Sequence, residues 1–219
     1  MRTSLNIGPI PSGAAGSRAK YDSDTVKEWA GNSQWRALRA DYRRFRQVHG
    51  FSGWKSEGLW VVAVYRMHRA LRTSRTPWLW APASAALAVP RKLLRMLTGI
   101  ELHPGADIGA GLLILHDSQI RVADGVKIGV DCVLGHVCTI GVGATPGVAK
   151  IGDHVHIAPH SCILGPVTIG DGAMIAASSL VLSDVPAGHT AIGVPARILP
   201  RFKGLQAGVG PPASPGGRD

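Results

Sequence analysis

The pattern of hydrophobic and polar positions changes in kind where Gly99 stands. Before it, three segments place apolar side chains mostly three, four, six or seven positions apart, as one face of an α-helix does. These segments are residues 23–49, 58–72 and 83–98. Ser23 or Asp24 is a suitable N-cap for the first helix, Pro90 is expected to kink or split the third, and Gly99 is expected to end it. We therefore predict an α-helical domain over residues 21–99.

From Ile100 onward the hydrophobic period is six residues. Its aliphatic members are Leu102, Ile108, Ile114, Val122, Ile128, Leu134, Ile140, Ile151, Ile157, Ile163, Ile169, Ile175 and Val181. Small residues mostly follow them, and a second compact residue often lies four places after each. A period of six fits neither an isolated amphipathic helix nor a lone strand. It fits a solenoid with three six-residue faces per coil, in which aliphatic side chains point inward and stacked parallel strands pair their backbones. We predict a β-helix over residues 100–199.

Two interruptions of the repeat are candidate functional loops. Two residues are inserted between Ile114 and Val122, and about five between Ile140 and Ile151, where the sequence GVGATPGVAK is rich in turn formers. Loops that leave a rigid solenoid often carry binding or catalytic residues.

Composition and charge limit the partners. Hydrophobic residues make up 45% of the chain and charged residues 17%, which is a globular balance. Residues 1–20 and 200–219 are rich in Gly, Pro, Ala and Ser, and we expect both ends to be mobile. The net charge of +10 is concentrated in residues 36–46 and 66–95. No zinc-finger spacing or RNA-binding signature accompanies these cations, so we expect an anionic small molecule as partner, and no nucleic acid.

The apolar segment that begins at Trp78 bears on membrane contact. The longest apolar stretch ends at Val89, contains Pro82 and is too short to span a bilayer. No continuous apolar signal segment follows Arg2, so a cytoplasmic location is expected. Arginines flank Trp78, which leaves peripheral membrane contact as an alternative, although such stretches more often form the packed interior of a helical domain.

Three cysteines and three histidines of the repeat are candidates for binding or catalysis. Cys132, Cys138 and Cys162 have neither CxxC spacing nor an even count, so neither a disulfide framework nor a zinc site is indicated, and the first two fall at inward positions of the repeat. His116 and His136 each stand two places after an aliphatic position and should stack about 5 Å apart on successive coils. His160 falls near the same edge one coil further on. Such histidines either form a functional site or are ordinary polar residues of the surface.

Residues 99–198 resemble the serine acetyltransferase family of hexapeptide-repeat, left-handed parallel β-helix acyltransferases. The matching segments read GIELHPGADIGAGLLILH, KIGDHVHIAPHSCILGPVTIGDGAMIAASSLVLSDVP and AIGVPARI, and the helical segment before them is more weakly similar to that family's N-terminal domain. The resemblance implies that His116 is the general base. It also implies that Glu101, fifteen positions earlier, is the acid that orients it, where the family usually has Asp.

The same resemblance implies a site for acetyl-CoA in a groove between coils and between the subunits of a homotrimer, which can pair into a dimer of trimers. The positions that match the groove are Gly141, Ala158, Pro159 and Ala177, with Arg197, Arg201 and Lys203 near enough in sequence to meet the phosphates. Packing at tight corners is the alternative reason for the small residues. Transfer from a thioester needs no metal, and corner N–H groups can hold the oxyanion.

Two departures from the family bear on the acceptor. The loop GVGATPGVAKI lacks the family's Arg-His pair, and Leu115 replaces the aspartate that holds the serine ammonium. Burial of a free amino acid without partners for its two charges is costly. The segment LGHVCTIG around His136 is similar instead to a stretch of the sugar O-acetyltransferases.

We therefore predict an acetyl-CoA-dependent O-acetyltransferase with Leu115 and His136 at the acceptor. The predicted acceptor is a sugar or another small hydroxylated metabolite, and L-serine is the alternative. The alternative of another class is a non-catalytic β-helix scaffold that docks on a partner through its basic helices.

Overall fold

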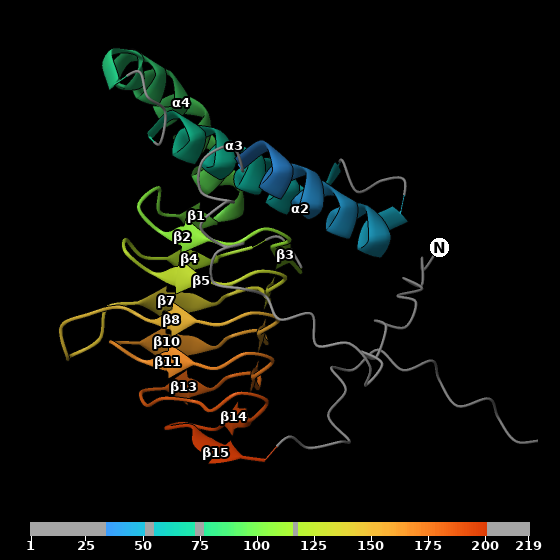
Figure 1. The fold of residues 1–219 in the computed structure, drawn as a ribbon, viewed down its shortest axis with the longest axis vertical. Coiled ribbons are helices and arrows are strands. Elements are labelled where there is room, and N and C mark those ends of the chain that lie inside the picture. Colours follow the sequence, from blue (N-terminus) through green and yellow to red (C-terminus); the bar gives the residue numbers. More distant parts are fainter. Residues whose placement is uncertain (1–33, 51–54, 73–76, 116–117, 201–219) are drawn as a thin grey trace, which may run out of the picture.

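Three helices precede a parallel β-solenoid in the computed structural model, which describes residues 34–50, 55–72, 77–115 and 118–200 (Figure 1). The helices are α2 (Gln34–His49), α3 (Glu57–Arg72) and α4 (Pro77–Thr98). They lie across the end of the solenoid at which its first coil begins. The predicted fold class, helices followed by a parallel β-helix, is confirmed. The predicted start of the first helix, residues 23–33, lies outside the described residues.

Helix α4 differs from its prediction at its start and at its prolines. It begins at Pro77 rather than at residue 83, and it runs unbroken through Pro82 and Pro90. Proline suits the first turn of a helix, and each of the later prolines removes one main-chain donor without ending the helix. The predicted stop is confirmed, because the N–H of Gly99 closes the last turn onto the carbonyl of Arg95 at 2.8 Å and Gly99 has φ of +72°.

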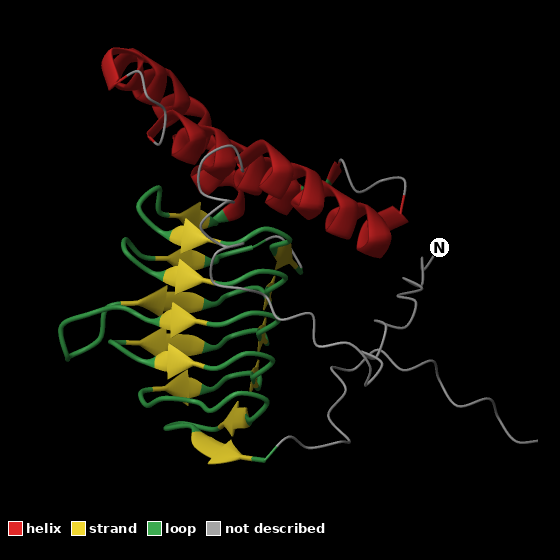
Figure 2. Ribbon diagram, viewed as in Figure 1, coloured by secondary structure: helices red, strands yellow, loops and turns green. Residues whose placement is uncertain are grey.

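The strands that follow are short and repeat around three faces (Figure 2). Their bounds are β1 (Glu101–Leu102), β2 (Asp107–Ile108), β3 (Leu113–Ile114), β4 (Arg121–Val122), β5 (Lys127–Ile128), β6 (Val133–Leu134), β7 (Thr139–Gly141), β8 (Lys150–Ile151), β9 (His156–Ile157), β10 (Cys162–Leu164), β11 (Thr168–Ile169), β12 (Met174–Ile175), β13 (Leu180–Val181), β14 (Thr190–Ile192) and β15 (Arg197–Leu199). One sheet has the order β1-β4-β7-β10-β13, the second β11-β8-β5-β2, and the third β15-β14-β12-β9-β6-β3. All pairs are parallel except β14 with β15.

The six-residue repeat fills the interior as predicted. All thirteen aliphatic positions of the repeat are buried, with exposed fractions between 0% and 5%. The compact positions four places later are buried too, including Cys132, Ser161 and Val185. A continuous apolar column therefore runs through the coils, and the backbone ladder around it is satisfied by successive coils.

The first coil has no earlier coil to pair with. A buried ion pair from the helices forms hydrogen bonds with its main-chain groups instead. The side chain of Arg66 on α3 donates from Nε to Oδ2 of Asp41 at 2.9 Å and from its Nη atoms to the carbonyls of Ile108 and Gly109. Oδ1 of Asp41 on α2 accepts the N–H of Leu112 at 2.8 Å. Both charged side chains are almost fully buried, with exposed fractions of 2% and 0%.

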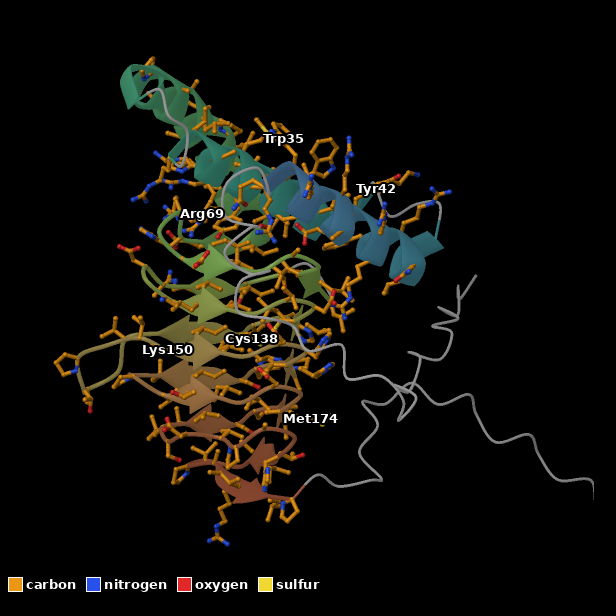
Figure 3. The ribbon with its side chains drawn as sticks, in the orientation of Figure 1. Trp35, Tyr42, Arg69, Cys138, Lys150 and Met174 are labelled. Atoms are coloured by element: carbon orange, nitrogen blue, oxygen red, sulfur yellow. The ribbon has the colours of Figure 1, made fainter. Side chains whose placement is uncertain are left out.

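Three further side chains complete this cap. The hydroxyl of Tyr65 donates to the carbonyl of Ala106 at 2.7 Å and accepts the N–H of Ile108 at 3.2 Å. Arg69, labelled in Figure 3 at the junction of helices and coils, donates to the same carbonyl at 2.6 Å. Arg44 reaches the carbonyl of Gly111 at 2.6 Å. Helix side chains thus pair four carbonyls and two N–H groups of the first coil.

Within the described residues, no helix is long and apolar enough to cross a membrane. The side chains of Trp78, Leu79 and Trp80, on which peripheral membrane contact was considered, lie outside the described side chains.

Replacement of Arg66 by Met should destabilise the fold strongly. It leaves the Asp41 carboxylate buried without its cation, and loss of one partner of a buried pair costs about 3–5 kcal/mol. Urea unfolding followed by circular dichroism measures the change. Arg43→Met, at an exposed position of α2, is the control and should stay within about 0.5 kcal/mol. The double variant D41L/R66M should recover part of the loss. A midpoint for R66M equal to that of the control would contradict the capping role.

Candidate functional site

The predicted histidines lie at one corner of the solenoid, which we call the histidine edge. It comprises residues 115, 118–120, 135–138, 158–161 and 176–179, where the chain passes from the β3-β6-β9-β12 sheet to the β4-β7-β10-β13 sheet. Main-chain hydrogen bonds stack its coils. The N–H of Val137 donates to Ser118 at 3.0 Å, that of His160 to His136 at 3.0 Å, and that of Ser178 to Pro159 at 2.9 Å.

His136 and His160 meet at this edge. Their ring centroids are 5.2 Å apart and the ring planes are inclined at 81°, so one ring presents its edge to the face of the other. The prediction that His160 falls beside His136 one coil further on is confirmed. Two imidazoles from separate coils therefore share one surface region, and each has a ring nitrogen able to donate or accept a proton.

A close approach of two coils positions the turn that bears His136. A Cβ atom on Gly135 would lie 2.6 Å from the main-chain nitrogen of Pro159, closer than real contacts allow. The turn itself uses positive φ at Val137 (55°) and, one coil later, at His160 (62°), a conformation uncommon for residues with side chains. Glycine at position 135 and the ladder of hydrogen bonds together fix where His136 leaves the coil.

The inserted pair of residues falls at the same corner. The N–H of Leu115 donates to Leu134 at 2.8 Å, as that of Gly135 does to Ile157, so Leu115 matches Gly135 in the stack. Ser118 in turn matches His136. The N–H of Gln119, which follows Ser118, donates to Thr98 at the end of α4, and the N–H of Val137, which follows His136, donates to Ser118. The extra residues are therefore 116 and 117. His116 itself lies outside the described residues, and its predicted role stays a prediction.

This register corrects one expectation. His116 was expected to take the same place in its coil as His136 takes one coil later, but Ser118 takes that place. The count from Ile114 placed the insertion after the histidine, whereas the hydrogen bonds place it directly after Leu115.

Glu101, the predicted orienting acid, adjoins the histidine edge. It pairs with Arg121 in the β1-β4 ladder, and its N–H donates to the carbonyl of Ile120 at 2.7 Å. Its carboxylate is 3.1 Å from Nη1 of Arg95 and 3.7 Å from Nε of Arg121, and the side chain is 34% exposed. Two arginines thus hold the carboxylate. Neither arginine was predicted as a partner of Glu101, although the place of Arg121 beside Glu101 follows from the repeat itself.

The predicted acetyl-CoA residues divide into two groups. Ala158, Pro159 and Ala177 lie on the histidine edge, where Ala158 is buried and Ala177 exposed. Arg197 is exposed on β15 and lies close to the same edge, because the N–H of Ala196 donates to the carbonyl of Leu180 at 2.7 Å. Gly141 is buried at the far end of β7, where the inserted loop leaves, so it is the member of the five that lies away from the edge. Arg201 and Lys203 lie outside the described residues.

The inserted loop between β7 and β8 projects from the solenoid (Figure 1). Residues 142–149 contain no charged side chain, and Val142 is 62% exposed. A loop of this composition has no charged side chain that could neutralise a carboxylate or an ammonium group. Among the described residues, no group of three or more His, Cys, Asp or Glu side chains is arranged to hold a metal ion.

Cys138 lies next to His136 but faces the interior. Its Sγ is 3.3 Å from the carbonyl of Ala158, and burial raises the pKa of its thiol to about 11. Burial likewise raises the pKa of Cys132 to about 12. The prediction that both belong to the core is confirmed, and neither thiol is suited to act as a nucleophile near neutral pH.

Comparison with known proteins identifies the family. Residues 149–183 match the family described as bacterial transferase hexapeptide (six repeats). A serine acetyltransferase of Helicobacter pylori is 34% identical over 145 residues, which cover 65% of this chain and 81% of that protein. The chain belongs to the serine acetyltransferase family. Serine acetyltransferase 1 of Arabidopsis chloroplasts is 37% identical over 155 residues, which cover 69% of this chain but only about half (46%) of that longer protein.

Solved structures of serine acetyltransferases have the same fold. The soybean serine acetyltransferase complexed with serine has a TM-score of 0.66 and 29% identity, and the match covers 80% of this chain and 73% of that one. A serine acetyltransferase in complex with CoA also has a TM-score of 0.66, with 26% identity, and the match covers 80% of this chain and 74% of that one. The resemblance inferred from the sequence is therefore confirmed for family and fold.

Cys138 should resist alkylation in the folded protein. With a pKa of about 11, only about one thiol in a thousand is ionised at pH 8. A brief iodoacetamide pulse at pH 8, read by peptide mass spectrometry, should leave Cys132 and Cys138 unmodified, and both should react fully once guanidinium unfolds the chain. Rapid modification of Cys138 in the folded protein would show that its thiol is not buried.

Proposed function

We propose that this chain transfers an acetyl group from acetyl-CoA to a hydroxyl group of a small acceptor. The observation that carries the proposal is the insertion of two residues, 116 and 117, between Leu115 and Ser118 of the histidine edge, beside which Glu101 lies in β1. Membership of the serine acetyltransferase family supports it, as does the relative solved in complex with CoA.

In the proposed reaction, an imidazole nitrogen of His116 takes the proton of the acceptor hydroxyl as its oxygen attacks the thioester carbonyl carbon. The C–S bond then breaks, the ester is released, and the CoA thiolate takes the proton back from the imidazolium. Glu101 orients His116, and its two arginine neighbours keep the carboxylate in place. Because a thiolate is a good leaving group, one base is sufficient for the transfer.

The acetyl-CoA contacts we propose are Gly141, Ala158, Pro159, Ala177 and Arg197. Ala158, Pro159, Ala177 and Arg197 lie on or next to the histidine edge, whereas Gly141 lies at the far end of β7. A homotrimer would explain this division, because the histidine edge of one subunit can face the far end of β7 of the next. We therefore propose that acetyl-CoA lies between subunits.

We propose L-serine as the acceptor, and this choice rests on the relatives. Relatives that are similar in sequence carry the name serine acetyltransferase, and the soybean enzyme was solved with serine. If serine binds beside His116, its charges must be met by residues other than the family's usual ones. Ser118, His136 and the main-chain groups of the histidine edge are polar groups close to that position in the stack.

A second acceptor class, a sugar or other uncharged hydroxyl compound, is favoured by one observation. Leu115 is half-buried and packs against the hydrophobic core, and the loop over residues 142–149 carries no charge. Neither can neutralise an amino acid, whereas an uncharged hydroxyl compound needs only hydrogen bonds.

Initial rates of CoA release with L-serine and with a panel of monosaccharides and glycosides decide between the acceptors. We expect L-serine to give the highest kcat/KM, with O-acetylserine identified by mass spectrometry. D-Serine is the matched control, because it has the same charges and hydroxyl in the opposite configuration. A sugar that is acetylated faster than L-serine would overturn the serine assignment and leave the transferase assignment standing. No transfer to any acceptor would contradict both.

His116→Asn should lower kcat by about 10²- to 10⁴-fold, the usual contribution of a general base. Glu101→Gln should lower kcat less, and Glu101→Asp, which restores the family's usual residue, should retain most of it. His154→Asn is the control, since His154 is an exposed histidine at a different corner. Each variant is checked by circular dichroism. Unchanged turnover in folded H116N would remove His116 from the mechanism.

A further inference from the structure

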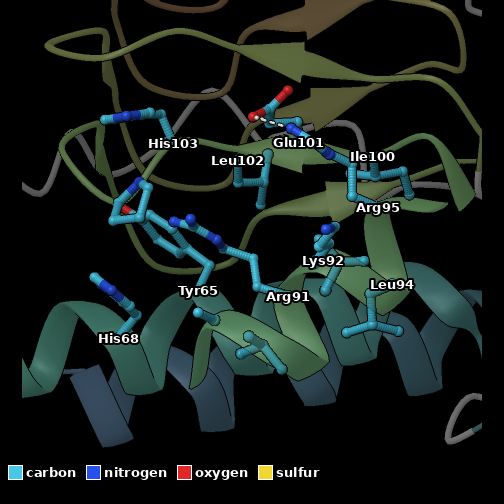
Figure 4. A pocket seen from close by; sticks show the side chains of 14 residues that line it. Tyr65, His68, Arg91, Lys92, Leu94, Arg95, Ile100, Glu101, Leu102 and His103 are labelled. Carbon is cyan, nitrogen blue, oxygen red and sulfur yellow. Dashed lines mark hydrogen bonds and ion pairs between the residues drawn. The ribbon is translucent and has the colours of Figure 1, made fainter. Parts of the chain in front are cut away.

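A cavity of about 210 Å³ lies between α3, α4 and the first strand of the solenoid (Figure 4). Its apolar wall includes Tyr65 and Leu94 from the helices and Ile100 and Leu102 from the start of the solenoid. The cavity is smaller than the 300–1,000 Å³ typical of sites for drug-sized ligands, so it suits a compact molecule. Its wall favours a ligand with an apolar body.

The rim of the cavity carries an excess of positive charge. Arg91, Lys92 and Arg95 from α4 line it, and Glu101 is its acidic lining residue. The carboxylate of Glu101 is engaged by Arg95 at 3.1 Å and by Arg121 at 3.7 Å. Within the described part of the chain, no carboxylate lies within ion-pair distance of Arg91 or Lys92. A negatively charged ligand would supply the missing countercharge.

A buried histidine on the cavity wall adds an unmet hydrogen bond. His68 on α3 is 9% exposed, and its Nδ1 has no hydrogen-bond partner among the described residues. Burial lowers the pKa of His68, and the positive charges of Arg91 on α4, Arg72 on α3 and His103 beyond β1 lower it further. Asp124 is 3.2 Å from Nδ1 of His103, but His68 itself has no carboxylate within ion-pair distance among the described residues. Buried polar atoms without partners are rare, and such an atom at a cavity points to a ligand.

We propose that this cavity binds a small organic anion, in which a carboxylate or phosphate group faces Arg91 and Lys92 and a short apolar body lies against Tyr65, Leu94 and Leu102. Arginine and lysine together accept either anionic group. A bare inorganic anion would leave the apolar wall in contact with water, and an uncharged apolar molecule would leave the cations unpaired. The cavity therefore selects a ligand that has both an anionic group and an apolar body.

A ligand bound in the cavity would also affect the contacts of the Glu101 carboxylate. Arg95 lines the cavity and holds the Glu101 carboxylate, so an anion that attracts Arg95 weakens that contact. This consequence for turnover rests on the proposed function, in which Glu101 orients His116. The binding itself does not depend on it.

Isothermal titration of the full chain with benzoate, phenyl phosphate and benzyl alcohol tests the proposal. Benzoate and phenyl phosphate distinguish the two anionic groups, and benzyl alcohol has the same ring without charge. We expect saturable binding of at least one of the anions, with benzyl alcohol at least about tenfold weaker, since a charge-assisted hydrogen bond contributes about one decade of affinity. Inorganic phosphate alone should bind more weakly than phenyl phosphate.

Variants locate the binding. Arg91→Gln should weaken anion binding about tenfold, while Lys127→Gln, at an exposed position of β5, should not change it. In NMR spectra, the imidazole signal of His68 should titrate at higher pH when benzoate is bound. Absence of saturable anion binding, equal affinity for benzyl alcohol, or binding unchanged in folded R91Q would each overturn the proposal. These readouts do not use acetyl transfer, so failure of the proposed function would be seen separately.

Discussion

The parallel ladder of main-chain hydrogen bonds between successive coils is the interaction on which the rest of this protein depends. Each coil pairs the main-chain N–H and carbonyl groups of the next. A shift in the pairing of one coil would therefore be carried to every coil after it. The ladder also leaves one coil without a neighbour at its start. The buried pair Arg66 and Asp41, with Tyr65 beside it, donates to and accepts from that coil. The helices are therefore a structural part of the solenoid, because they complete its hydrogen bonding.

The interior of the solenoid could be predicted from the sequence, because an aliphatic residue recurs at every sixth position and aliphatic side chains are buried. All thirteen positions of that repeat are buried. The cap could not be predicted in the same way. Asp41 and Arg66 are 25 residues apart on different helices, and no local pattern links them to each other or to Gly109. The unbroken course of α4 through Pro82 and Pro90 was also missed, because proline weakens a helix by an amount that packing against α3 can offset.

In the candidate site, too, contacts between positions of the repeat could be predicted from the sequence, and contacts outside the repeat could not. The meeting of His136 with His160 follows from the repeat. The contacts of Glu101 are different, because Arg95 reaches it from the last turn of a helix and no period connects the two. The assignment of the extra residues to positions 116 and 117 required the observed hydrogen bonds, since the sequence alone permits the insertion anywhere in the corner. The candidate residues belong to irregular segments, and a repeat predicts only the approximate place of such segments.

The inserted pair at the histidine edge has a consequence for how such a protein can change over generations. The stack returns to its regular pairing by Ser118, and the strand after it, β4, is paired on both sides as any other strand. Lengthening or shortening of a corner is therefore absorbed within that corner, and the apolar column beneath does not respond. Mutation can therefore change the side chains that one coil presents at a corner with little effect on the stability of the fold.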